Sequence, residues 1–183
     1  VNISEISQLQ TDHPQAIFGT DGNDVINGDD NTYNILIGGS GDDTLLGGDN
    51  KRSGGGYVMN IFQFSDNSGT DVIKDFFIQE LVEEGTNRSY GTVDGRYKSD
   101  IIEVVSGINS TDIKTAQELL NNSTNNSSGH AEINLGQGNS ITIEGISIDD
   151  IGPQYFHIIP EYLNVIQGSD SPGKSGHNKL IAS

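Results

Sequence analysis

Aspartates recur at a fixed place in glycine-rich turns of this chain, and their spacing could bind a cation. The stretch GGSGDDTLL, residues 38–46, fits the nonapeptide pattern G-G-x-G-x-D-x-U-x at every fixed position. The stretch GTDGNDVIN, residues 19–27, fits it with one change, Thr20 for glycine. Ordinary hairpin turns explain the pattern less well, because they do not require an aspartate in one phase with an aliphatic residue two positions later.

The repeat length indicates how these aspartates would meet. Two nine-residue repeats make one coil of a solenoid, so each turn stacks on the turn after next. Glycine permits positive φ and lets the carbonyl groups of stacked turns approach closely. The sixth-position carboxylates then face one another across a gap. Such a gap offers six or more oxygen ligands at about 2.3 to 2.6 Å, which suits Ca²⁺ better than Zn²⁺ or Mg²⁺.

The two sides of the predicted coil differ. The turns ending at Asp24, Asp43 and Asp71 fall on one side, and those ending at Asn34 and Asn60 fall on the other. We predict one ion between the Asp24 and Asp43 turns and another between the Asp43 and Asp71 turns. Any ion on the asparagine side should be weaker or absent, because an amide carries no charge. The predicted metal-site residues are Gly19, Thr20, Asp21, Gly22, Asp24, Gly38, Gly39, Ser40, Gly41, Asp43, Gly69 and Asp71.

Six short strands are expected to hold these turns. Their inward-pointing centres would be Ile17, Ile26, Leu36, Leu45, Phe62 and Ile73. The predicted fold class is all-β: a short right-handed parallel β-roll with calcium-binding turns, capped by a C-terminal region of a β-hairpin and a short helix.

Composition agrees with a metal-dependent solenoid. Only 32% of the 183 residues are apolar, which is thin for a globular core but suits a solenoid that buries a narrow file of aliphatics. The net charge of −17 disfavours nucleic acid and anionic membranes as partners. Self-repulsion should also destabilise the compact state until cations arrive, which would make calcium a folding ligand. The absence of cysteine excludes disulfides and thiolate metal sites.

The chain divides into a lead-in (residues 1–15), the roll (16–75), a non-repetitive cap (76–160) and a tail (161–183). In the cap we predict a hairpin turn at residues 94–95, a helix over 112–120 with Ser110 or Thr111 as N-cap, and a loose polar loop over 121–129. A second hairpin should follow, with Ala131, Ile133 and Leu135 on one strand and Ile141 and Ile143 on the other. Phe76, Phe77, Ile78, Leu81 and Val82 could close the last coil.

No catalytic constellation is visible, so the chain is not predicted to be an enzyme. The four histidines share no metal-ligand spacing, and neither G-x-S-x-G nor H-E-x-x-H occurs. Residues 168–175, GSDSPGKS, match the P-loop pattern, but too few residues follow for the helix and strands that a nucleotide site requires, so a glycine-rich tail is favoured. The N-terminus lacks the features of a signal peptide, and no apolar run could span a bilayer. Without an initiator methionine, the chain is expected to be part of a longer protein.

These motifs resemble the C-terminal region of an RTX protein, a bacterial substrate of type I secretion. Besides the repeats, the resemblance rests on TDVIKDF (residues 70–76), DIIEV (100–104) and the hairpin that leads to the strand FHI (156–158). It covers about residues 16–159. The departures are the small number of repeats, asparagine at two sixth positions, and a long insertion before Asp100.

The resemblance implies a non-enzymatic, calcium-binding module that folds outside the cell and supports type I secretion of a large adhesin. Its partners would be calcium, the secretion machinery and upstream domains of a longer chain, with neither nucleic acid nor membrane insertion. The protein would be secreted, extracellular or on the bacterial surface. Two alternatives stay open: the same module in a secreted enzyme or toxin (protease, lipase or haemolysin), and a self-standing recognition module for a glycan or an ice-like surface. A flat threonine ladder would favour the latter, but Thr20, Thr44 and Thr70 do not share one repeat position.

Overall fold

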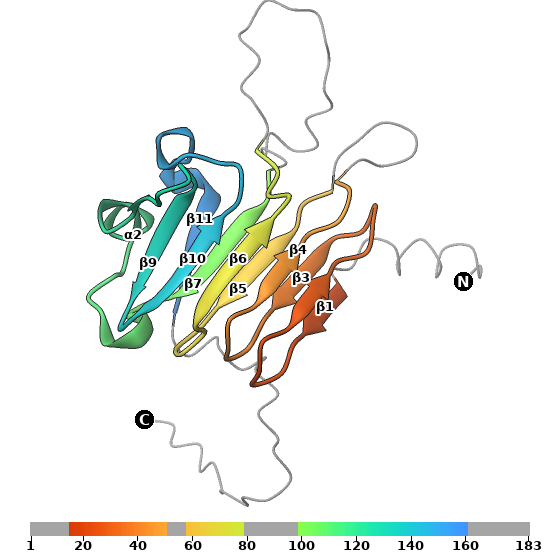
Figure 1. The fold of residues 1–183 in the computed structure, drawn as a ribbon, viewed down its shortest axis with the longest axis horizontal. Helices are drawn as coiled ribbons and strands as arrows, with labels where there is room; N and C mark the ends of the chain where they lie inside the picture. Colours follow the sequence, from red (N-terminus) through yellow and green to blue (C-terminus); the bar gives the residue numbers. More distant parts are fainter. Residues whose placement is uncertain (1–14, 51–57, 79–98, 161–183) are drawn as a thin grey trace, which may run out of the picture.

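The computed structural model describes residues 15–50, 58–78 and 99–160 (Figure 1). Its strands are β1 (Gln15–Phe18), β2 (Val25–Asn27), β3 (Asn34–Ile37), β4 (Thr44–Leu46), β5 (Ile61–Phe64), β6 (Thr70–Lys74), β7 (Ile101–Val105), β8 (Thr124–Asn125), β9 (Ala131–Gly136), β10 (Asn139–Ile143) and β11 (Phe156–Ile159). The helical segments are η1 (Ile108–Ser110), α2 (Ala116–Asn121), η2 (Ile148–Asp150) and η3 (Pro153–Tyr155). Strands dominate the described residues, which confirms the all-β prediction.

Successive strands alternate between two sheets. One sheet has the order β1-β3-β5-β7-β11, and every neighbouring pair in it is parallel. The other has the order β2-β4-β6-β10-β9-β8, in which β2, β4, β6 and β10 run parallel while β9 is antiparallel to both of its neighbours. Residues 15–50 and 58–78, where β1 to β6 alternate between the sheets, are called the coil below (Figure 1).

The core of the coil lies between the sheets and is built from the expected residues. The central side chain of each strand points inward because side chains alternate across a strand, and β5 buries Phe64 as well as Phe62. Stacked strands place these side chains in register, as Leu36 with Phe62 and Leu45 with Ile73. Ile17 is partly buried against the core, and the other five predicted centres are buried: Ile26, Leu36, Leu45, Phe62 and Ile73.

Both sheets continue beyond residue 75, where the repeats end. Strand β7 pairs in parallel with β5, and β10 pairs in parallel with β6. Phe76 is buried between Phe62 and Tyr155, with ring centroids 5.9 and 6.3 Å away respectively, as expected for a residue that closes the last coil. The predicted hairpin is present as β9 and β10. The described residues after 75, namely 76–78 and 99–160, therefore extend the same two sheets by strands that carry no repeat.

The start of the helix predicted over residues 112–120 is wrong. Helix α2 begins at Ala116, and its N-cap is Thr115 instead of Ser110 or Thr111. The Thr115 side chain accepts from the Glu118 backbone N–H, and the Glu118 carboxylate accepts from the Thr115 backbone N–H. Ser110, the last residue of η1, has a φ of 61°, in the left-handed region, so it does not begin a right-handed α-helix.

The polar segment 121–129 is more ordered than the predicted loose loop. It contains β8, which pairs with β9, and the Asn125 carboxamide oxygen accepts from the Ile148 backbone N–H at 2.8 Å. The predicted turn at residues 94–95, the side chains of Leu81 and Val82, and the P-loop pattern at 168–175 lie outside the described residues. Among the residues that are described, no helix has the length and apolar character needed to cross a membrane.

Candidate metal centre

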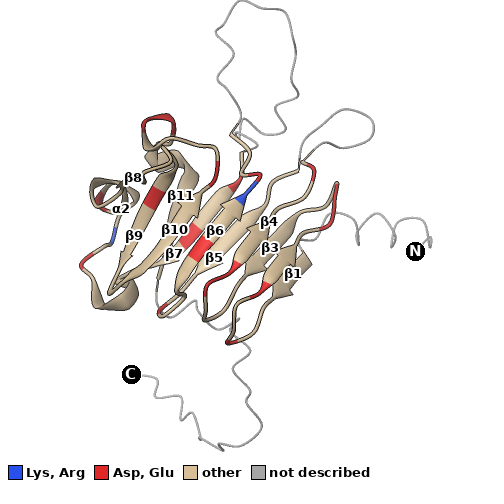
Figure 2. Ribbon diagram, viewed as in Figure 1, with Lys and Arg blue, Asp and Glu red and all other residues tan. Residues whose placement is uncertain are grey.

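The sixth-position aspartates stack on one side of the coil, which we call the aspartate side. Asp24 directly precedes β2, Asp43 directly precedes β4, and Asp71 lies at the start of β6. The register pairs Val25 with Thr44 and Thr44 with Val72. The residues that precede them, Asp24, Asp43 and Asp71, therefore form one row. Figure 2 shows acidic residues in the turns at both ends of the strands. The predicted count of alternate strands therefore places the aspartates correctly.

In Asp43 and in Asp71, one carboxylate oxygen links the turn of that residue to the preceding turn. The backbone N–H of Asp24 donates to Oδ1 of Asp43 at 2.8 Å, and the N–H of Asp43 donates to Oδ1 of Asp71 at 2.9 Å. Asp43 and Asp71 are each only 1% exposed. In this row Asp43 contacts both neighbours, and Asp24 is half-buried whereas the other two carboxylates are buried.

The second oxygen of these buried carboxylates lacks a partner. Among the described residues, Oδ2 of Asp43 and Oδ2 of Asp71 are buried and accept no hydrogen bond. Burial, with the nearby charge of Asp43, raises the pKa of Asp71 to about 7. Burial, with the charges of Asp24 and Asp42, also raises the pKa of Asp43. A buried carboxylate oxygen in this state requires either a proton or a cation.

The first turn differs because Thr20 stands in place of glycine. Oδ2 of Asp24 accepts from the Thr20 backbone N–H at 2.6 Å and from the Thr20 hydroxyl at 2.8 Å. These bonds lower the pKa of Asp24. The Thr20 hydroxyl also accepts from the Gly22 backbone N–H, and Asp21 is exposed. Asp24 is therefore held as an ionised carboxylate within its own turn.

Backbone carbonyls enter the gaps where glycines leave room for them. A Cβ on Gly19 would overlap the carbonyl oxygen of Gly38 and lie 3.0 Å from Oδ2 of Asp24. These two oxygens, from stacked turns, are therefore close together. Gly39, with φ of 102°, lies against the carbonyl oxygen of Thr20, and Gly69, with φ of 96°, lies against that of Gly41. Ser40 lies in the middle turn and is half-buried.

The donor set fits calcium. Within residues 15–50, 58–78 and 99–160, no three histidine, cysteine, aspartate or glutamate side chains form a group that could hold an ion. Any ion held between these turns would therefore need backbone carbonyls beside the carboxylates. An all-oxygen set of carboxylates and carbonyls in an irregular gap suits Ca²⁺, whereas Zn²⁺ favours nitrogen and sulfur.

A second row of residues, absent from the predicted site, joins the same turns. Oδ1 of Asn23 accepts from the Asp42 N–H, and Oδ1 of Asp42 accepts from the Thr70 N–H, both at 2.9 Å. These residues occupy the fifth position of their turns. Fifth-position side chains bind the following turn, whereas sixth-position aspartates bind the preceding one. In the sequence, the polar residue at the fifth position of each turn could have predicted this second row.

The aspartate row ends at the third turn. The Gly69 backbone N–H donates to the carboxamide oxygen of Asn139 at 2.8 Å, and the Ser140 N–H donates to the carbonyl of Gly69. An uncharged residue from β10 thus contacts the turn of Asp71. The next stacked strand therefore adds no further aspartate to the row.

The opposite side, which we call the asparagine side, stacks Asn34, Asn60 and Asp100. They precede or begin β3, β5 and β7 in register, and each is at most 1% exposed. Oδ1 of Asp100 accepts from the Asn60 backbone N–H and the Asn50 amide, both at 2.7 Å, while Oδ2 accepts from the Phe77 N–H. Burial raises the pKa of Asp100 to about 6. Unlike Asp43 and Asp71, this carboxylate has both oxygens bonded.

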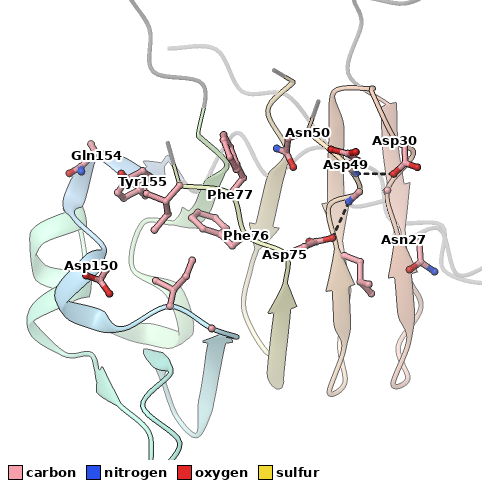
Figure 3. A pocket seen from close by; sticks show the side chains of 16 residues that line it. Asn27, Asp30, Asp49, Asn50, Asp75, Phe76, Phe77, Asp150, Gln154 and Tyr155 are labelled. Atoms are coloured by element: carbon pink, nitrogen blue, oxygen red, sulfur yellow. Dashed lines mark hydrogen bonds between the residues drawn. The ribbon is translucent and has the colours of Figure 1, made fainter. Parts of the chain in front are cut away.

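A groove of about 1330 Å³ opens beside the asparagine side (Figure 3). It is lined by apolar residues, among them Phe77 and Tyr155, and by four carboxylates: Asp30, Asp49, Asp75 and Asp150. Oδ1 of Asp30 accepts from the Asp49 N–H at 2.8 Å, and Asp75 accepts from the N–H groups of Gly47 and Gly48. Asp30 and Asp75 therefore bond to the backbone of the neighbouring turn.

Replacing Gly39 by alanine should destabilise the coil by more than about 2 kcal/mol, because it combines a positive φ with overlap on the Thr20 carbonyl. Urea unfolding in calcium would measure this. Gly129→Ala is the matched control: its φ is 81°, but nothing lies within 4 Å of the added Cβ. It should cost about 1 kcal/mol. Equal losses in the two variants would contradict the close approach of the turns.

No protein-family model matches this chain, and no curated protein matches it significantly. Among solved structures, the extracellular lipase LipA from Serratia marcescens is similar, with a TM-score of 0.48 and 20% sequence identity over 79% of this chain. The similarity covers 21% of the lipase, so this chain spans about a fifth of that protein's length. At this level the likeness establishes neither a family nor an activity.

Proposed function

We propose that this chain is a non-enzymatic, calcium-binding module of the RTX type whose coil, a parallel β-roll, folds when calcium binds to its aspartate side. The observation that carries the proposal is the pair of buried, unpartnered oxygens, Oδ2 of Asp43 and Oδ2 of Asp71. One ion would lie between the Asp24 and Asp43 turns and one between the Asp43 and Asp71 turns. The carbonyls of Gly38, Thr20 and Gly41 would complete their coordination.

Electrostatics supports calcium as a folding ligand. The chain carries a net charge of −17, and the aspartate row concentrates negative charge in buried positions. A cation that binds only the folded state adds RT ln(1 + [Ca²⁺]/Kd), about 2.7 kcal/mol per site at a hundredfold excess over Kd. Two such sites supply a large part of the net stability of a typical domain.

The proposal extends to the cell. A chain that needs millimolar calcium would stay unfolded in a low-calcium cytoplasm, pass a secretion channel, and fold outside. Folding there would oppose its return. We propose type I secretion of a larger protein, an adhesin, with this module at an extracellular or cell-surface position.

A calcium titration tests the molecular part of this proposal. Circular dichroism should show little β-structure in excess EGTA and a β-rich chain in millimolar calcium, and calorimetry should find two bound ions per chain. Magnesium at the same concentration is the control and should give a much smaller change, because Mg²⁺ requires near-octahedral geometry. A full β signal and an unchanged melting temperature in EGTA would contradict the proposal.

A further inference from the structure

The amide of Asn34 lies inside a ring of oxygens on the asparagine side. Its Nδ2 is 2.9 Å from the carbonyl oxygen of Asp29, and 3.1 Å from those of Thr32 and Gly47. A fourth oxygen, Oδ1 of Asn60, is 2.9 Å away. Asn34 is only 1% exposed. An amide nitrogen carries just two hydrogen atoms, so four acceptors share two donors.

The position of this nitrogen matches that of a ligand oxygen on the aspartate side. A Cβ on Gly28 would lie 2.5 Å from the carbonyl oxygen of Gly47 and 2.8 Å from Nδ2 of Asn34. A Cβ on Gly19 would likewise meet the carbonyl of Gly38 and Oδ2 of Asp24. At these two glycines, a stacked carbonyl oxygen and a polar side-chain atom of the same turn thus lie in similar places. The two sides differ in what faces the carbonyls: a hydrogen-bond donor on one side and a carboxylate on the other.

This difference has an electrostatic consequence. Carbonyl oxygens that converge in a buried gap repel one another unless a positive group lies between them. The Asn34 N–H groups carry a partial positive charge, so they act as this positive group without adding any net charge. Asp29, the residue whose carbonyl takes part, also donates its own N–H to Oδ1 of Asn34 at 3.1 Å, so the side chain is held at both ends.

We propose that Asn34 is a positioning residue whose amide takes the place of a calcium ion, so that the asparagine side closes without metal. The coil then has one metal-dependent side and one metal-independent side, and Asn34 and Asn60 set the number of ions that it binds. The inference rests on the proposed function of the aspartate side, which it deepens.

The test replaces the amide donor by a carboxylate. In Asn34→Asp with Asn60→Asp, the carbonyls of Asp29, Thr32 and Gly47 lose their donor and face two new carboxylates. The second substitution is needed because a rotated Asn60 amide could donate to an aspartate at position 34. Calcium per chain, measured by calorimetry and elemental analysis, should rise by one relative to the unmodified chain. The β signal of the double variant in saturating calcium should match that of the unmodified chain, which shows that the variant folds.

Asn34→Ala is the matched control, since it removes the donor and adds no ligand. In calcium it should lower the melting temperature, and its ion count should stay unchanged. A double variant with an unchanged ion count would overturn the inference. So would an alanine variant that loses a bound ion, because Asn34 would then be a ligand. If the unmodified chain binds no calcium, the proposed function fails instead, which distinguishes the two results.

Discussion

Replacing Asp43 by alanine is expected to abolish calcium-induced folding of the chain. Asp43 lies in the middle of the aspartate row: it accepts from the Asp24 N–H, and its own N–H donates to Asp71. Both proposed ions border its turn, so the variant should lose calcium stabilisation of about 5 kcal/mol at a hundredfold excess over Kd. That loss is comparable with the whole stability of many domains. Calorimetry and circular dichroism across a calcium titration would measure it.

Two further variants make this result specific. Asp112→Ala removes an exposed carboxylate outside the coil and should leave the calcium titration unchanged. Asp43→Asn should also lose calcium binding, but it should keep more structure in EGTA than Asp43→Ala, because an amide can donate to converging carbonyls as Asn34 does. Calcium binding by Asp43→Ala equal to that of the unmodified chain would contradict the assignment of the metal centre.

In excess EGTA, the stability of the chain should fall as the pH rises from about 4 to about 7. Burial raises the pKa of Asp71 from its ordinary value of 3.8 to about 7. The folded state therefore holds a proton across a range in which the unfolded state has already released it, so the free energy of unfolding decreases with pH. The expected loss is on the order of 4 kcal/mol over this range. Circular dichroism in EGTA at several pH values would measure it, as a β signal that weakens from pH 4 to pH 7.

Calcium should reverse this trend, because an ion can bind Asp71 only after its proton leaves. The apparent affinity of the chain for calcium, measured by titration, should therefore increase with pH up to about neutrality. Asp71→Asn should reduce the pH slope in EGTA, leaving the part due to Asp100, whose pKa is raised to about 6, and to Asp43. Stability that rises between pH 4 and 7 in EGTA would contradict the burial of an unpartnered carboxylate at position 71.

Much of the coil could be predicted because its signals are local. A nine-residue period sets which turn stacks on which, and side-chain alternation sets which residue of each strand points inward. Leu36, Leu45 and Phe62 are buried for this reason. The same period places Asp24, Asp43 and Asp71 on one side. The helix start was also within reach, since Thr115 and Glu118 have capping-box spacing.

Only the tertiary structure decided what happens where the repeat stops. Asp100 joins the row of Asn34 and Asn60 although 40 residues separate it from Asn60. Strands β7 and β10 extend the two sheets through pairings that no period specifies. Non-local pairing of this kind depends on which buried edges and side chains complement each other in the folded chain, and neither spacing nor residue type encodes it.

The same division between sequence and tertiary structure applies to the polar side chains on the two sides of the coil. The sequence by itself determined that aspartates lie on one side and asparagines on the other, because residue identity and phase are enough for that. The orientation of each polar side chain came from the fold. An oxygen of Asp43 remains buried without a partner, whereas the Asn34 amide faces four oxygens. Which groups converge in a gap depends on the backbone of the neighbouring turn, and that backbone exists only once the coil has closed.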